Sequence, residues 1–200
     1  MKIGVFGDVH GDLQSLTKVL KHLRAEGVDT LVCLGDLVDG GSQERAVVET
    51  IRDQGIPCVR GNHDVCNTAD LDPEHQHWLD RLPDELQVGT AFCTHISPRR
   101  IRCHKIHNGG EAFNVFDECA HRRIFVGHTH VSLVFGDKGE TATWAREIPF
   151  TFGIPLILDP EERIIVSVGA VAHSRDRQDT ARCAMFDDQL DTLTLVSIPR

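Results

Sequence analysis

The seven residues VRGNHDV, positions 59–65, place three polar side chains directly after an apolar run. The run IPCV, residues 56–59, has the character of a buried strand. Asn62, His63 and Asp64 follow it and are costly to bury unless each of them has a partner. Matching polar groups at the ends of other apolar runs would supply such partners.

Strand-like and helix-like patterns alternate along the first two thirds of the chain. After residue 131 the pattern becomes strand-rich, and no linker rich in Pro, Gly or Ser interrupts it. The alternation predicts right-handed βαβ units and a buried, largely parallel sheet, to which the second half adds antiparallel strands. The sequence thus predicts a single α/β domain over residues 1–200. The expected strands cover residues 2–7, 30–35, 56–61, 90–95 and 123–128, and the expected helices 13–23 (capped by Asp12), 42–54 and about 110–121.

Each of the five apolar strands ends in Asp, Asn or His. The carboxyl ends of the strands in an open α/β sheet line a common crevice, so we expect these side chains to converge. Residues two apart in an extended segment point the same way, which applies to the first and last pairs of the set. The set is Asp8, His10, Asp36, Asp39, Asn62, His95, His128 and His130.

This mixture of side chains is typical of a metal site. Carboxylates, imidazoles and one amide oxygen, without a thiolate, suit Mn, Fe, Zn or Co. Even without Asp39, the seven remaining groups exceed the needs of one tetrahedral ion and fit two ions that share a bridging carboxylate. Any one of them alone could be a helix cap or a satisfied core histidine, but that explanation does not extend well over five strand ends.

The motifs and their order resemble the calcineurin-like metallophosphoesterase superfamily. They are D-x-H (8–10), G-D-x-x-D (35–39), G-N-H-D (61–64), a strand-end His95 and G-H-x-H (127–130). The segments 167–176 and 181–187 are similar to the C-terminal part of its small bacterial phosphodiesterase branch. The resemblance implies an αββα sandwich, in which two packed mixed β-sheets are flanked by helices, with a dinuclear site at the strand ends.

The resemblance also assigns roles to single residues. His63 would stand beside the substrate as a general acid, Asp64 would hold its ring, and Gly61 would permit the turn that presents them. Asp39 would lie behind the ligands or cap the helix at 42–54. Two divalent transition-metal ions are implied, with manganese the first choice and Fe, Zn, Co or Ni as alternatives. One would be held by Asp8, His10, Asp36 and His130, and the other by Asp36, Asn62, His95 and His128, with Asp36 bridging.

The implied activity is in-line attack of a metal-bridging hydroxide on a small phosphodiester or nucleotide-type phosphoester. Two alternatives remain open: a weak or inactive binding scaffold or sensor on the same fold, and a protein phosphatase. The protein Ser/Thr phosphatases carry a phosphate-gripping Arg where this chain has Gly40, which places the second alternative low. The loop 97–105 supplies either a replacement anion clamp, through Arg99, Arg100 or Arg102, or a solvated charged surface.

Composition limits the partners and the compartment. The net charge of -9 argues against nonspecific nucleic-acid binding. No apolar run is long enough for a transmembrane helix, and the N-terminus does not read as a signal peptide. Seven cysteines without a C-x-x-C pair indicate neither a disulfide framework nor a zinc ribbon. We therefore expect a cytoplasmic protein with a small phosphoester as its partner; the oligomeric state is not indicated. The remaining histidines, His22, His75, His77, His104, His107, His121 and His173, are expected at the surface or in packing.

Overall fold

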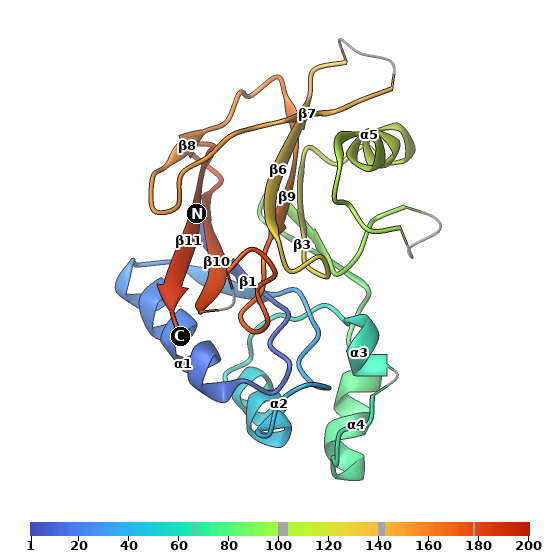
Figure 1. Cartoon of the computed structure of the whole chain (residues 1–200), viewed down its shortest axis with the longest axis vertical. Helices are drawn as coiled ribbons and strands as arrows, with labels where there is room; N and C mark the ends of the chain where they lie inside the picture. The colour runs from blue at the N-terminus through green and yellow to red at the C-terminus, as the bar shows by residue number, and fades with distance from the viewer. Residues whose placement is uncertain (66, 100–103, 140–142, 178) are drawn as a thin grey trace.

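Two mixed β-sheets lie face to face in the computed structural model of the chain, with helices on their outer sides (Figure 1). The structure describes residues 1–65, 67–99, 104–139, 143–177 and 179–200. This arrangement confirms the expected αββα sandwich.

The first sheet has the strand order β2-β1-β10-β11-β8. Its N-terminal strands β1 and β2 are parallel, while β10 pairs antiparallel with β1, β11 with β10, and β8 with β11. Most of this sheet is therefore antiparallel. The strands are β1 (Lys2–Phe6), β2 (Thr30–Cys33), β8 (Leu156–Ile157), β10 (Thr180–Asp187) and β11 (Thr192–Pro199).

The second sheet has the order β3-β4-β5-β9-β6-β7. Its centre is parallel, because β4, β5 and β9 run in one direction, and β3, β6 and β7 add antiparallel edges. The strands are β3 (Glu85–Val88), β4 (Ala91–Thr94), β5 (Arg123–Val126), β6 (Ser132–Asp137), β7 (Arg146–Glu147) and β9 (Arg163–Val168).

The helices are placed by local signals in the sequence. Asp12 caps the first of them, since its side chain accepts a hydrogen bond of 2.9 Å from the backbone N–H of Ser15, as expected from the sequence. Asn108 caps α5 in the same way through Glu111. The helices are α1 (Leu13–Ala25), α2 (Glu44–Asp53), α3 (Asn62–Val65), α4 (Pro73–Asp80) and α5 (Gly109–Glu118).

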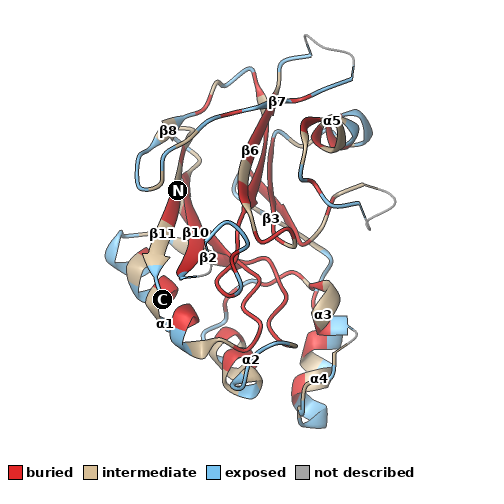
Figure 2. Ribbon diagram, viewed as in Figure 1, coloured by how far each residue is buried: buried red, intermediate tan, exposed pale blue. Residues whose placement is uncertain are grey.

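Three apolar layers hold the sandwich together. Val5 and Phe186 of the first sheet meet Phe125 and Val166 of the second between the sheets. Helices α1, α2 and α4 cover the outer face of the first sheet, and α5 covers that of the second. The loops after β1 and β2 are themselves buried below the sheets (Figure 2). These loops carry the candidate site.

One expected strand is absent, and the apolar runs do not lie together in the one largely parallel sheet that their alternation predicts. Residues 56–61 make only an isolated parallel bridge, between Cys33 and Cys58. The chain then turns into α3, so the run cannot extend along β2. The other four apolar runs are divided between the two sheets, two in each, so their polar ends meet across the sandwich.

No helix in the described part of the chain has the length and apolar character needed to cross a bilayer. The five cysteines within the described ranges, Cys33, Cys58, Cys93, Cys119 and Cys183, are free thiols.

Candidate metal centre

The site lies where four strands from the two sheets end. Loops after β1 and β2 bring polar groups from the first sheet, and loops after β4 and β5 bring them from the second. Two groups of side chains form there, and both contain Asp36. In each group the potential ligand atoms lie within 4.8 Å of one another.

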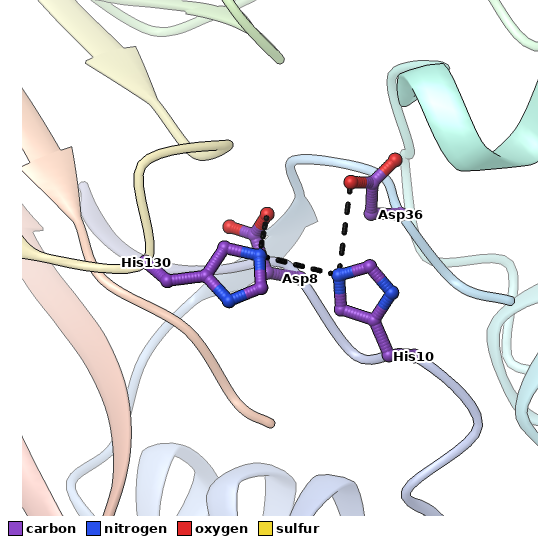
Figure 3. A group of neighbouring side chains, drawn as sticks. All are labelled: Asp8, His10, Asp36 and His130. Carbon is purple, nitrogen blue, oxygen red and sulfur yellow. Dashed lines mark hydrogen bonds and ion pairs between the residues drawn. The ribbon is translucent and has the colours of Figure 1, made fainter. Parts of the chain in front are cut away.

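The first group consists of four buried side chains, whose ligand atoms point toward one another in Figure 3. The Nε2 atoms of His10 and His130 are 3.2 Å apart. His10 Nε2 lies 3.7 Å from Asp36 Oδ2, and His130 Nε2 lies 3.3 Å from Asp8 Oδ1. Two carboxylates and two imidazoles therefore surround one point.

The second group shares Asp36 with the first. His95 Nε2 lies 3.1 Å from Asp36 Oδ2. The side-chain oxygen of Asn62 lies 3.1 Å from His95 Nε2 and 2.8 Å from His128 Nδ1. All seven side chains expected as metal ligands are thus brought together, in the two sets expected.

Backbone carbonyls fix the orientation of three of the imidazoles. His10 Nδ1 donates to carbonyls in the loop after β2 at 3.1 Å, His95 Nδ1 to the carbonyl of Leu34 at 2.7 Å, and His130 Nδ1 to that of His173 at 3.0 Å. Because a carbonyl only accepts, each Nδ1 carries a proton, and each Nε2 is the ring nitrogen that faces the centre. This is the arrangement that orients histidines on metals.

The D-x-H and H-x-H pairs do not have the extended backbone expected from the sequence, so that prediction is wrong. Five of the expected ligand residues have a left-handed backbone, which is uncommon for residues other than glycine. Among the described residues other than glycine, Asp191 is the only one with a positive φ that lies away from the metal centre. The ligand values of φ are 54° at Asp8, 45° at His10, 53° at Asp36, 65° at His128 and 61° at His130.

Gly61 allows the loops after β2 and before α3 to touch. A Cβ atom at Gly61 would lie 2.1 Å from Asp36 Oδ1 and 2.2 Å from its backbone nitrogen. The requirement for glycine is therefore close approach to the shared carboxylate.

The ligands hold protons unequally when no ion is present. Burial lowers the pKa of His95, but the Asp36 carboxylate outweighs it and raises the pKa to about 9. Burial raises the pKa of Asp36, but His95 and neighbouring donors lower it to about 2. Burial, helped by the His95 charge, lowers the pKa of His128 to about 4. A cation in place of the His95 proton would pair with the Asp36 carboxylate and with the neutral imidazoles of His95 and His128.

The donor chemistry fits divalent ions that prefer nitrogen and oxygen ligands. The model of the calcineurin-like phosphoesterase family matches residues 1–132 of the chain. The chain belongs to this family. The phosphoesterase is accordingly a metal-dependent hydrolase, as the motif order predicts.

Two similar proteins match nearly the whole length of the phosphoesterase, and a third matches a short part of it. It superposes on the crystal structure of a metallophosphoesterase from Sphaerobacter thermophilus with a TM-score of 0.87 and 29% identity, over 100% of this chain and 89% of the other. An uncharacterised protein of Methanocaldococcus jannaschii is 26% identical, over 98% of this chain and 86% of its own length. Serine/threonine-protein phosphatase 1 of Salmonella typhimurium is 36% identical over 63 residues only, 31% of this chain and 29% of its own.

Beside the ligands of the phosphoesterase, His63 is held by a different carboxylate from the one expected. Its Nδ1 lies 2.6 Å from Asp39 Oδ2, and its ring centroid lies 5.1 Å from that of His10. The prediction that Asp64 holds this ring is wrong. The sequence neighbours are separated because they lie on a helical turn, which sends adjacent side chains in different directions.

Asp64 instead supports the backbone of the site. Its buried carboxylate accepts hydrogen bonds of 2.8–2.9 Å from the backbone N–H groups of Asp36, Leu37 and Gly61. Burial and the nearby Asp36 raise the pKa of Asp64 above its usual value, although the backbone donors of Gly61 and Leu37 act in the opposite direction. Asp64 thus fixes the loop that carries the shared ligand. Asp39 does not cap α2, because the N-cap position of that helix is Gln43.

His173 is a neighbour of the centre that the sequence did not indicate. Its ring centroid lies 5.8 Å from that of His10, and its φ of 55° is left-handed like those of the ligands. It lies in the segment 167–176, for which the resemblance implied no role for any single residue. In the expected anion clamp, Arg99 pairs with Glu118 at 2.8 Å, and Arg100 and Arg102 lie outside the described residues.

Proposed function

We propose that this phosphoesterase hydrolyses a small phosphodiester or nucleotide-type phosphoester at a centre of two divalent ions, with manganese as the first choice. The observation that carries the proposal is the position of Asp36, which belongs to two ligand groups at once. When bound, two such ions supply a water of lowered pKa and neutralise charge on the phosphoryl oxygens. One ion would be held by Asp8, His10, Asp36 and His130, and the other by Asp36, Asn62, His95 and His128.

His63 is proposed as the general acid. Its Nδ1 is held by Asp39, which leaves Nε2 to donate to the oxygen of the leaving group. Its side chain is 40% exposed, so a substrate can reach it. Proton donation of this kind contributes roughly 10²–10⁴-fold to the rate. Asp64 acts in this proposal through the backbone that it holds.

A pocket beside the second group suits the substituent of a small phosphoester. It encloses about 160 Å³, and Asn62, His95 and the apolar side chains of Val65 and Ile96 contribute to its lining. Ligand atoms and apolar surface thus lie in one recess, as is usual for small-molecule sites.

The same contacts favour an enzyme over the two alternatives. A binding scaffold has no need for an imidazole held beside the centre by its own carboxylate, as His63 is by Asp39. A protein phosphatase is disfavoured because the similarity to the Salmonella phosphatase covers under a third of this chain.

The proposal is tested by removing metal with a chelator and restoring Mn, Co, Ni, Zn or Mg in turn. Hydrolysis of p-nitrophenyl phosphate, bis(p-nitrophenyl) phosphate and a panel of nucleotides is then measured, with metal content per chain measured in parallel. We expect turnover to be lost with chelator and to return with a transition metal. Two bound ions without turnover of any ester would support the scaffold alternative.

A further inference from the structure

The loop between β9 and β10 is fastened to the metal centre by its backbone. The backbone N–H of Ala172 donates to the carbonyl of Asp8 at 2.9 Å, and that of Arg175 to the carbonyl of His130 at 3.0 Å. In Figure 1 this orange-to-red loop lies beside the yellow loop that follows β5. Its side chains are therefore placed next to the first ligand group.

One of these side chains fills the space at the position of Gly40. A Cβ atom at Gly40 would lie 3.3 Å from Nε2 of His173 and 3.2 Å from Cβ of His10. Gly40 also has a φ of 156°, which side chains rarely adopt. A side chain at position 40 would therefore be strained and would press against His173 and His10, so this position is poorly suited to an arginine.

A second side chain of the loop brings a positive charge to the segment that carries His128 and His130. The Arg175 guanidinium lies 3.4 Å from the carbonyl of Thr129, which stands between His128 and His130. Within the described parts of the chain, Arg175 has no carboxylate partner. The next arginines along the chain differ, since Arg177 pairs with Asp179 and Arg182 with Asp176.

The contacts of Arg175 leave its guanidinium able to bind an anion. A guanidinium has five N–H donors, and the weak contact to Thr129 uses one of them. The residue is exposed, so a ligand can reach it. Because the chain has a net charge of -9, a cation held here would also offset the repulsion of an anionic substrate.

We propose that Arg175 is the substrate-binding arginine of this site and grips the non-bridging oxygens of the substrate phosphoryl group. The inference rests on the proposed function. It places the anion clamp on the β9–β10 loop, in place of position 40 or the loop 97–105. A phosphomonoester dianion has one more anionic oxygen than a diester, so it should gain more from this contact.

The test compares Arg175→Met and Arg175→Lys with Arg177→Met, a control on the same loop whose side chain is 71% exposed. Inorganic phosphate is the probe, and its binding to the manganese-loaded protein is measured by calorimetry. Metal content and thermal unfolding are measured on the same samples. We expect Arg175→Met to weaken phosphate binding by roughly 10–100-fold. Arg175→Lys should lose less, and Arg177→Met should bind phosphate like the unaltered protein.

Kinetics provide a second readout. In Arg175→Met, KM for p-nitrophenyl phosphate should rise more than KM for bis(p-nitrophenyl) phosphate. Unchanged phosphate affinity in a variant that keeps its metal would overturn the proposal. So would loss of metal or a lowered unfolding temperature, because Arg175 would then be holding the loop of Thr129. Phosphate binding needs no turnover, so failure of the proposed function would be distinguishable.

Discussion

The two ligand groups share Asp36 but differ in charge and exposure. The first contains a second carboxylate, Asp8, and its four side chains are buried. The second adds the neutral Asn62, and His128 is only partly buried. Since carboxylates are the only anionic ligands here, the first group should hold its ion more tightly. The second, beside the open pocket, should exchange its ion more readily.

The strongest challenge to this comparison is Asp36→Asn, which removes the shared charge and keeps the shape. Both ions should be held weakly, and turnover should fall by roughly 10³-fold or more, because several kcal/mol of charge stabilisation are lost. Metal content by mass spectrometry and kcat check this. Two ions per chain with full turnover would show that Asp36 does not bridge.

His63→Ala tests whether a residue beside the first group is a ligand of it. Both ions should stay bound, while the rate falls by roughly 10²–10⁴-fold with substrates whose leaving oxygen is basic. The loss should be smaller with p-nitrophenolate, which needs less protonation. Asp39→Asn should reproduce the direction of this pattern more weakly, because Asp39 holds the ring.

Metal analysis and the choice of leaving group separate the outcomes for His63→Ala. Loss of one ion would make His63 a ligand. An equal rate loss for both kinds of leaving group would assign it to stabilising phosphoryl charge. Full activity on every substrate would remove it from the mechanism.

His10→Ala and His95→Ala sharpen the difference between the groups, since each removes one buried imidazole from one of them. The first variant should lose the tighter manganese-binding step and the second the weaker step. Each loss should exceed the roughly 10–100-fold that removing an outer partner of a ligand costs. Titration with manganese checks this. Loss of the same step in both variants would mean that the groups do not bind separate ions.

Proton release gives the smallest effect and concerns the second group. The pKa of His95 is raised to about 9, so at pH 7 the metal-free imidazole is charged. A metal binds the neutral imidazole, so loading of the second group should release about one proton from His95. Below pH 9 the affinity for the metal should rise by up to about tenfold for each unit by which the pH is raised. His128, with its pKa lowered to about 4, should release none.

Calorimetry in buffers of different ionisation enthalpy measures this release. His95→Gln is the control and should remove the part of the release that comes from His95. Loading without proton uptake by the buffer would contradict the protonated state of His95.

The sequence predicted which residues converge, but it did not predict the sheet arrangement that brings them together. Apolar runs that end in Asp, Asn or His were enough to select the side chains that the structure brings together. The apolar runs do not share one open sheet, because β1, the neighbour of β2, pairs with β10 (Thr180–Asp187) near the other end of the sequence. Pairing over such distances leaves no local pattern in the sequence.

The groups around the ligands were harder to predict for the same reason. Asp39 and His63 are 24 positions apart and meet through the fold, whereas adjacency in the sequence favoured Asp64. Arg175 and His173 reach the centre on a loop held by backbone hydrogen bonds to Asp8 and His130. Backbone contacts of this kind are independent of side-chain identity, so residue patterns do not reveal them.

The most direct test of two unlike sites around one carboxylate is an anomalous-scattering map from crystals soaked in manganese. Two peaks are expected, one among Asp8, His10, Asp36 and His130, the other among Asp36, Asn62, His95 and His128. At limiting manganese the first peak should have the higher occupancy. A single peak at saturating manganese, or a peak whose ligands exclude Asp36, would contradict the shared centre.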